Sequence, residues 1–98
     1  MRIISVKKLK DFWESGHADS EQSLKVWYQI IKQENFETPN EIKRLFPGAS
    51  FIGNNRIIFN ICGNKYRIVT HIRYDIKIVY VRFIGTHAEY DKINVTEV

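Results

Sequence analysis

Three side chains that can transfer or orient a proton occur close together near the end of the sequence. The stretch FIGTHAEYDKI, residues 83–93, places His87, Tyr90 and Asp91 three and four residues apart. Residues at this spacing lie on one face of a helix. We therefore expect an imidazole, a phenol and a carboxylate to share one side of a short helical turn. A polar turn without any chemical role is the alternative interpretation of the same residues.

The residues around this turn predict where it begins. Thr86 and Glu89 form a capping-box pattern, in which each side chain binds a backbone N–H at the start of a helix. Gly85 comes directly before this pattern and follows an apolar run. The sequence therefore predicts a strand that ends near Gly85 and a helical turn that begins at His87.

The length and composition limit the classes of protein to which the chain can belong. The 98 residues are enough for one domain with its own core, so we expect a single domain over residues 1–98. No apolar run approaches the roughly 20 residues that span a bilayer, and the first ten residues lack the apolar stretch of a signal peptide. The single cysteine, Cys62, cannot form an internal disulfide. We expect a cytoplasmic protein that does not contact the membrane.

The histidines and the charges indicate which ligands to expect. His17, His71 and His87 are scattered, so the sequence predicts no metal site and no small-molecule cofactor. The net charge is +4, but residues 56–82 hold six basic residues and one acid. Positive charge concentrated in one segment favours a polyanionic partner, although a solvated basic face is the commoner cause.

Helical patterns fill most of the first half of the sequence. After a short strand at residues 2–4, Ser5 is expected to cap a helix that ends near Gly16. A second helix should start at Asp19 or Ser20. Its apolar positions recur at helical spacing. A third, opened by the capping box of residues 38–41, should end before Pro47.

Strands separated by turns are predicted from Ala49 to Gly85, at 49–52, 56–62, 65–74 and 77–84. The turn residues at 53–55 and 63–64 are typical of hairpins, so the strands should form an antiparallel meander. The two longer helices must then cover one face of this sheet. The fold class predicted is α+β, with N-terminal helices on a mainly antiparallel sheet and a short C-terminal helical turn.

Alternation along the strands sorts their side chains onto two faces. One face is apolar and suits a helix-covered core: Ile57, Phe59, Ile61, Tyr66, Ile68, Ile72, Val79, Val81 and Phe83. The other face is polar: Asn60, Cys62, Arg67, His71, Arg73, Tyr80 and Arg82. Three arginines on adjacent strands repel one another unless an anion lies among them, and guanidinium groups match phosphate in geometry. The polar face is therefore a candidate phosphate-binding surface.

An imidazole beside arginines is suited to cleaving RNA without a metal or a protein nucleophile. A ribose 2′-hydroxyl attacks the adjacent phosphorus, a base removes its proton, and an acid protonates the departing 5′-oxygen. Positive charge stabilises the transition state. Tyr80 offers a surface on which a base can stack.

Two segments resemble a known family. FNICGNKYRIV, residues 59–69, and YVRFIGTHAEYDKI, residues 80–93, follow two N-terminal helices and look like the HigB family of bacterial toxins, within the RelE-like superfamily. The resemblance extends over essentially the whole chain. It implies a type II toxin–antitoxin toxin that cleaves mRNA on the ribosome, arrests growth, and is neutralised by a HigA-like antitoxin with a helix-turn-helix domain.

The resemblance also implies roles for single residues. Arg67 is the candidate contact to the scissile phosphate, His87 the general acid or base, and Tyr90 an orienting or proton-transfer group. Candidate RNA- or phosphate-binding residues are Asn60, Lys65, Arg73, Arg82, Asp91 and Lys92. Some superfamily members rely on lysine more than histidine, so Lys65 and Lys92 stay open as substitutes for the acid or base.

Two alternatives have different consequences for His87. A non-catalytic nucleic-acid-binding or operon-regulatory module would use the same arginines and would give His87 no special role. A protein-interaction domain would use its apolar or basic surface only to dock the antitoxin.

Overall fold

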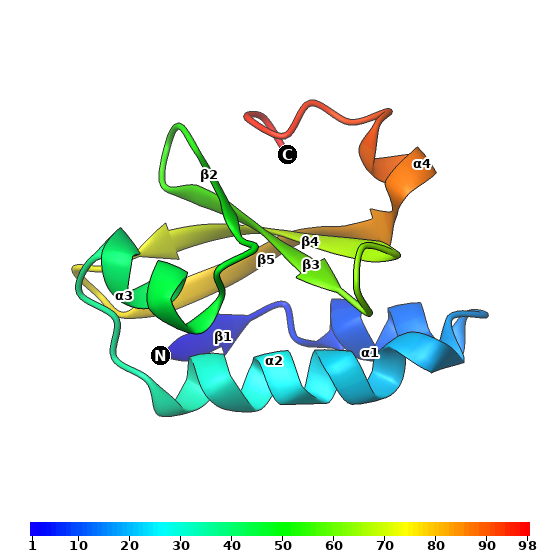
Figure 1. Ribbon diagram of the computed structural model, residues 1–98, viewed down its shortest axis with the longest axis horizontal. Helices are drawn as coiled ribbons and strands as arrows, with labels where there is room; N and C mark the ends of the chain where they lie inside the picture. The colour runs from blue at the N-terminus through cyan, green and yellow to red at the C-terminus, as the bar shows by residue number, and fades with distance from the viewer.

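Two helices lie against one face of a five-stranded sheet in the computed structural model, which describes residues 1–98 (Figure 1). The helices are α1 (Lys7–Glu14), α2 (Glu21–Gln33), α3 (Pro39–Leu45) and α4 (His87–Tyr90), with a 3₁₀ turn at Ala18–Ser20. The strands are β1 (Arg2–Ile4), β2 (Ser50–Ile52), β3 (Arg56–Ile61), β4 (Tyr66–Arg73) and β5 (Ile78–Thr86). The α+β prediction is confirmed. None of the helices combines the length and the apolar character needed to cross a membrane.

The strand order in the sheet is β1-β5-β4-β3-β2. Strands β2 to β5 form the predicted antiparallel meander, and β1 adds to it in parallel beside β5. Strand β4 is therefore central, and its outer face is flanked by the side chains of β3 and β5. Helices α1 and α2 cover the inner face, whereas α4 and the C-terminal segment lie on the other side of the sheet (Figure 1).

The core forms between the inner face and the helices, as the apolar periodicity predicts. Leu24, Trp27 and Ile31 of α2 are at most 2% exposed. The Trp27 ring meets Phe59 edge-on, with ring centroids 5.5 Å apart. Except for Phe83, every apolar residue assigned above to the inner face belongs to this core. Burial of these side chains is the main driving force for the fold.

The assignment of Phe83 to the core was wrong, because β5 contains a β-bulge. Val69 pairs with Phe83, but the next residue of β4, Thr70, pairs with Val81. Arg82 is thus the extra residue of β5. From Phe83 onward the side chains exchange faces, so Phe83 joins the outer face with Val69, and Ile84 packs against the core instead.

The outer face is not uniformly polar. Ile58 and Val69 pair across β3 and β4 on this face and are 4% and 0% exposed. The C-terminal segment, residues 91–98, runs above the face (Figure 1), and its end is bound there: Arg56 Nη2 donates to the Val98 carbonyl oxygen at 2.9 Å. A small second apolar layer therefore lies opposite the main core.

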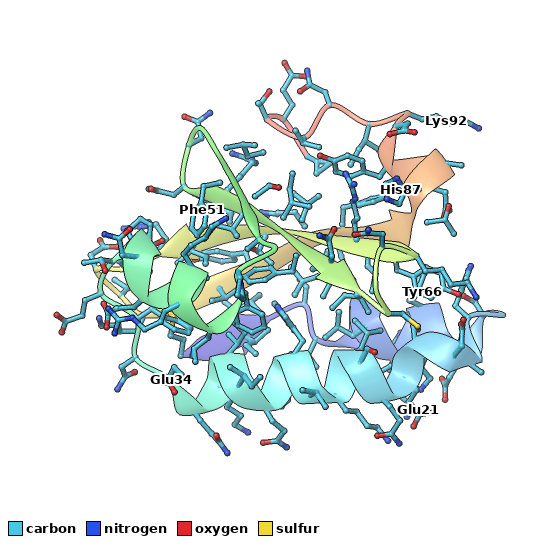
Figure 2. All side chains as sticks on the ribbon, in the orientation of Figure 1. Glu21, Glu34, Phe51, Tyr66, His87 and Lys92 are labelled. Carbon is cyan, nitrogen blue, oxygen red and sulfur yellow. The ribbon has the colours of Figure 1, made fainter.

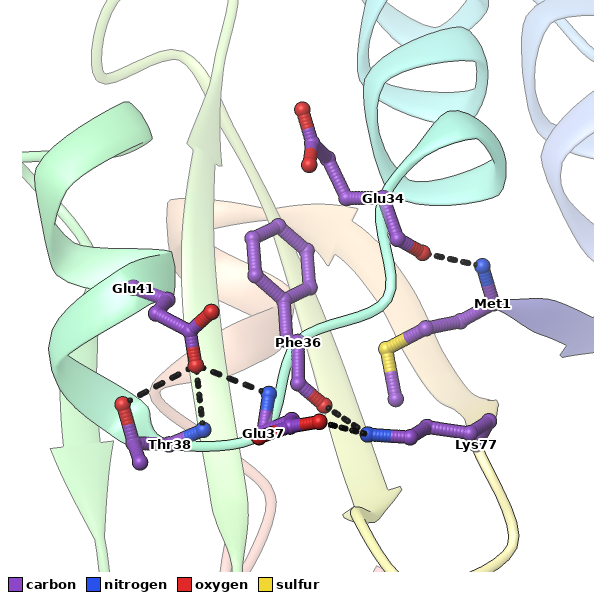
Figure 3. Close-up of polar contacts among 7 residues, drawn as sticks. All are labelled: Met1, Glu34, Phe36, Glu37, Thr38, Glu41 and Lys77. Atoms are coloured by element: carbon purple, nitrogen blue, oxygen red, sulfur yellow. Dashed lines mark hydrogen bonds and ion pairs between the residues drawn. The ribbon is translucent and has the colours of Figure 1, made fainter.

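Polar contacts join the connection between α2 and α3 to the β4–β5 turn (Figure 3). Lys77 Nζ donates to the Phe36 carbonyl oxygen at 3.0 Å. Glu41 Oε2 accepts from the backbone N–H groups of Glu37 and Thr38, both at 2.9 Å, which confirms the predicted helix start at Thr38. These hydrogen bonds lower the pKa of Glu41. The Met1 amino group donates to the Glu34 carbonyl oxygen at 2.5 Å and thereby fixes β1 beside the end of α2.

Two local assignments are corrected. Ser5 does not cap α1 with its side chain: it has φ +70°, and its carbonyl oxygen accepts from Lys8 N, because the chain turns from β1 into α1 within two residues. Cys62 does not lie on the outer face. It follows β3 in the turn with φ +57°, packs against the core, and directs its thiol to the Asp19 carbonyl oxygen.

The bulge predicts a steric requirement at Gly85. A Cβ atom there would lie 2.6 Å from Phe83 Cζ and 3.2 Å from Glu89 Cβ. We expect Gly85→Ala to lower the free energy of unfolding by about 1–3 kcal/mol in urea titrations, the usual cost of overpacking. The control is Gly53→Ala, whose Cβ would meet nothing within 4 Å. Equal stability of both variants would show that Phe83 does not restrict this position.

Candidate active site

Arg67 and Tyr90 are brought into contact at the end of the outer face. The Arg67 guanidinium lies over the Tyr90 ring, with its Cζ 4.6 Å from the ring centroid. Arg67 comes from β4 and Tyr90 from α4, and both are half-buried. A guanidinium over an aromatic face is held by a cation–π attraction of about 0.5–2 kcal/mol. No carboxylate pairs with Arg67, and its buried Nε has no hydrogen-bond partner.

The predicted capping box holds α4 above Arg67. Thr86 N donates to Glu89 Oε1 at 2.9 Å, and Glu89 N donates to Thr86 Oγ1 at 3.2 Å. Gly85, the register partner of Arg67, has no side chain, so α4 can turn back over the strand. The N–H group of Thr86 stabilises the ionised carboxylate and lowers the pKa of Glu89.

His87 is the first residue of α4 and lies two positions beyond Gly85 (Figure 2). It is half-buried and makes no side-chain hydrogen bond within the chain. Asp91 N donates to the His87 carbonyl oxygen at 3.0 Å, and Asp91 itself is exposed at the end of α4. The turn thus places Tyr90 against Arg67 and His87 three residues before it, at the start of α4.

Three other predicted binding residues are held by contacts within the chain. Arg73, at the far end of β4, forms two hydrogen bonds with Asp75, at 3.0 and 2.8 Å. Asn60 pairs with Arg67 in the register, but its amide donates to the Gly48 carbonyl oxygen at 3.2 Å. Lys65 is paired with Asp19. None of these three polar groups is free in the way that Arg67 is.

The Lys65 contact also involves Tyr66, whose hydroxyl donates to Asp19 Oδ1 at 2.6 Å. The hydrogen bond from Lys65, and then that from Tyr66, lowers the pKa of Asp19, and the same carboxylate raises the pKa of Lys65. A more firmly protonated Lys65 is a weaker acid, so this contact argues against it as the substitute for His87. Lys92, the other substitute, is exposed and extends outward (Figure 2).

Two histidines have surroundings that the sequence did not indicate. His17 stacks on Phe12 with ring centroids 4.1 Å apart. His71 lies on the outer face and stacks against Tyr80, at 6.0 Å between centroids. Burial, and then the charges of three arginines headed by Arg56, lower the pKa of His71.

Comparisons with known proteins identify the family of this chain. Residues 20–93 match the family model of HigB toxins, described as the RelE-like toxic component of a toxin–antitoxin system. The mRNA interferase HigB of Escherichia coli O6:H1 strain CFT073 is 35% identical over 73 residues, covering 72% of this chain and 71% of that protein. The mRNA interferase toxin HigB of Escherichia coli K12 is 29% identical over 93 residues, covering 93% and 88%. The range matched by the family model, residues 20–93, includes all the candidate residues of the second half of the chain.

The capping box predicts a pH-dependent contribution to stability. The folded pKa of Glu89 is lowered, so its contribution is complete above the unfolded value of about 4.3 and is lost as the pH falls through the folded value. We expect Glu89→Gln to have a lower Tm than the wild type at neutral pH and the same Tm in acid, below the folded pKa of Glu89. Glu14→Gln, at an exposed carboxylate of α1 without a side-chain hydrogen bond, is the control and should match the wild type at both. A Tm difference for Glu89→Gln that persists in acid would contradict the assignment.

Proposed function

The chain belongs to the HigB family of RelE-like toxins, the toxic components of toxin–antitoxin systems, and we propose that it cleaves mRNA as an endoribonuclease. The names of its relatives, mRNA interferases, support this activity. The observation that carries the proposal is the Arg67 guanidinium, which lies over Tyr90 beside α4 without a carboxylate partner. A free, oriented guanidinium is suited to bind a phosphodiester in two-point contact.

In the proposed reaction the ribose 2′-hydroxyl is the nucleophile. The 2′-oxygen–phosphorus bond forms while the bond from phosphorus to the 5′-oxygen breaks. A base takes the proton of the 2′-hydroxyl, and an acid gives one to the departing 5′-oxygen. The products are a 2′,3′-cyclic phosphate and a free 5′-hydroxyl, and DNA is not cut because it lacks the nucleophile.

Each proposed role follows from the position of the side chain. Arg67 contacts the scissile phosphate and stabilises the charge that builds up on it. His87 performs one of the two proton transfers, because its imidazole stands free at the start of α4. Tyr90 packs against Arg67 and keeps the guanidinium in one plane. Arg82 adds positive charge further along the outer face.

The family also determines the kind of partner. A toxin of this class has an antitoxin, and we propose a HigA-like protein with a helix-turn-helix domain. We further propose that the chain acts in the cytoplasm on mRNA in the ribosome. A non-catalytic RNA-binding module is the second candidate, because binding would use the positive charges of Arg67 and Arg82 and needs no proton transfer. It differs in giving His87 no effect on the chemistry.

Substitution of His87 separates these two candidates. We expect His87→Ala to slow single-turnover cleavage on programmed ribosomes roughly 10²- to 10⁴-fold, because a proton-transfer group is lost, and to leave ribosome affinity unchanged. Arg67→Ala should slow cleavage roughly 10²- to 10³-fold, as expected when transition-state charge loses a stabilising donor, and should also weaken binding. Arg44→Ala, an exposed arginine of α3, is the matched control.

Circular-dichroism melts would check that each variant is folded. A 2′-deoxy substitution at the cut site should block the reaction. If a folded His87→Ala variant cleaves at the rate of the wild type, His87 has no part in the mechanism. Absence of any cleavage by the wild type would favour the binding module.

Two substitutions of Tyr90 test whether it positions Arg67 or transfers a proton. Tyr90→Phe keeps the ring under the guanidinium, so we expect most of the cleavage rate to remain. Tyr90→Ala removes the ring and the cation–π contact of about 0.5–2 kcal/mol, so the rate should fall clearly below that of Tyr90→Phe. If Tyr90→Phe is as slow as His87→Ala in the same assay, the phenol hydroxyl takes part in proton transfer instead.

A further inference from the structure

A second arginine–tyrosine pair lies on the outer face, away from the first. The Arg82 guanidinium is over the Tyr80 ring, with Cζ 4.9 Å from the centroid. Tyr80 in turn stacks against His71, with an interplanar angle of 29°. We call this Arg82–Tyr80–His71 arrangement the stacked array. Resting on the proposed function, we propose that the stacked array binds a nucleotide of the message other than the one that is cut.

The charges of the outer face single out Arg82. Arg73 is held by Asp75, and Arg56 donates to the Val98 carbonyl oxygen. Arg82 has no carboxylate partner, and its side chain is exposed. Arg67 and Arg82 are therefore the two arginines of this face whose guanidinium groups are held only by an aromatic ring. The same feature that supports a phosphate contact at Arg67 is present a second time.

The chemistry of the stacked array suits a nucleotide. Proteins bind unpaired RNA bases by stacking them on aromatic rings or on guanidinium planes, with cationic groups beside them for the phosphates. His71 and Tyr80 are register partners and lie side by side across β4 and β5. The exposed guanidinium of Arg82 forms the open end of the stack. It offers both a plane for a base and a charge for a phosphate.

The spacing assigns the stacked array to a different nucleotide from the scissile one. Arg67 and His71 are four residues apart on β4, or about 13 Å at about 3.3 Å per residue. Stacked bases repeat every 3.4 Å or so, which is several times shorter. The apolar pair Val69 and Phe83 lies between the two sites and supplies no polar contact. The far end of the stacked array is thus set apart from the scissile phosphate, and in the proposal the message extends along the face so that a different nucleotide reaches it.

The experiment measures binding apart from cleavage. Ribosomes are programmed with a message that carries a 2′-deoxy nucleotide at the cut site, and abasic nucleotides are placed one at a time on either side. We expect Tyr80→Leu and Arg82→Ala to weaken binding roughly 5- to 150-fold, the range for loss of one base stack. Tyr28→Leu, a half-buried tyrosine of α2 with Lys32 over its ring, is the matched control.

The abasic positions provide the decisive comparison. At one flanking position the abasic nucleotide should lower the affinity of the wild type. The same abasic nucleotide should not further lower the affinity of Tyr80→Leu, which has already lost the stacking contact. Equal sensitivity of both proteins at every position overturns the proposal. So does unchanged RNA affinity together with weaker antitoxin binding, which would make the stacked array a protein contact. If Tyr80→Leu does not fold, the exposed variant Arg82→Ala provides the same comparison. If the wild type binds the message but does not cleave it, that result counts against the proposed function and not against the stacked array.

Discussion

One extra residue in β5 determines how the outer face is built. Without the bulge at Arg82, Phe83 would enter the core and Gly85 would face the helices. With it, Gly85 faces outward opposite Arg67, and the missing side chain leaves room for α4 to fold back over β4. Bulges commonly redirect side chains at functional sites, and here the bulge residue itself contributes the second free guanidinium.

The contact between Arg67 and Tyr90 depends on this backbone arrangement more than on its own strength. A cation–π contact of about 0.5–2 kcal/mol does not by itself hold a four-residue helix in place. The capping box of Thr86 and Glu89 begins α4 at a defined residue, and the C-terminal segment continues over the outer face to Arg56. Tyr90 is thus positioned from both sides, and Arg67 needs only to lie against it.

Local patterns predicted the elements, but contacts between distant residues could not be read from the sequence. The capping box at Thr86 involves neighbours in the chain, so the start of α4 was predicted at the correct residue. The bulge was missed because apolar residues at 79, 81 and 83 keep the alternation as far as Phe83, and only the pairing with β4 shows that Phe83 has changed faces. The ion pair of Lys65 with Asp19 joins residues 46 apart, and no periodicity indicates it. Arg73 and Asp75 are two residues apart, and this pair was predictable.

These pairings change how the positive charge of residues 56–82 is interpreted. Residues 56–82 hold six basic residues and one acid, which suggests a broad basic face. The structure places Lys65, Arg73 and Lys77 beside acidic side chains and ties Arg56 to a carbonyl oxygen. Two guanidinium groups remain, each oriented by a tyrosine and separated along the sheet by an apolar pair. A surface of diffuse charge attracts any polyanion, whereas two oriented donors at a fixed spacing favour a single strand whose phosphates and bases can reach both.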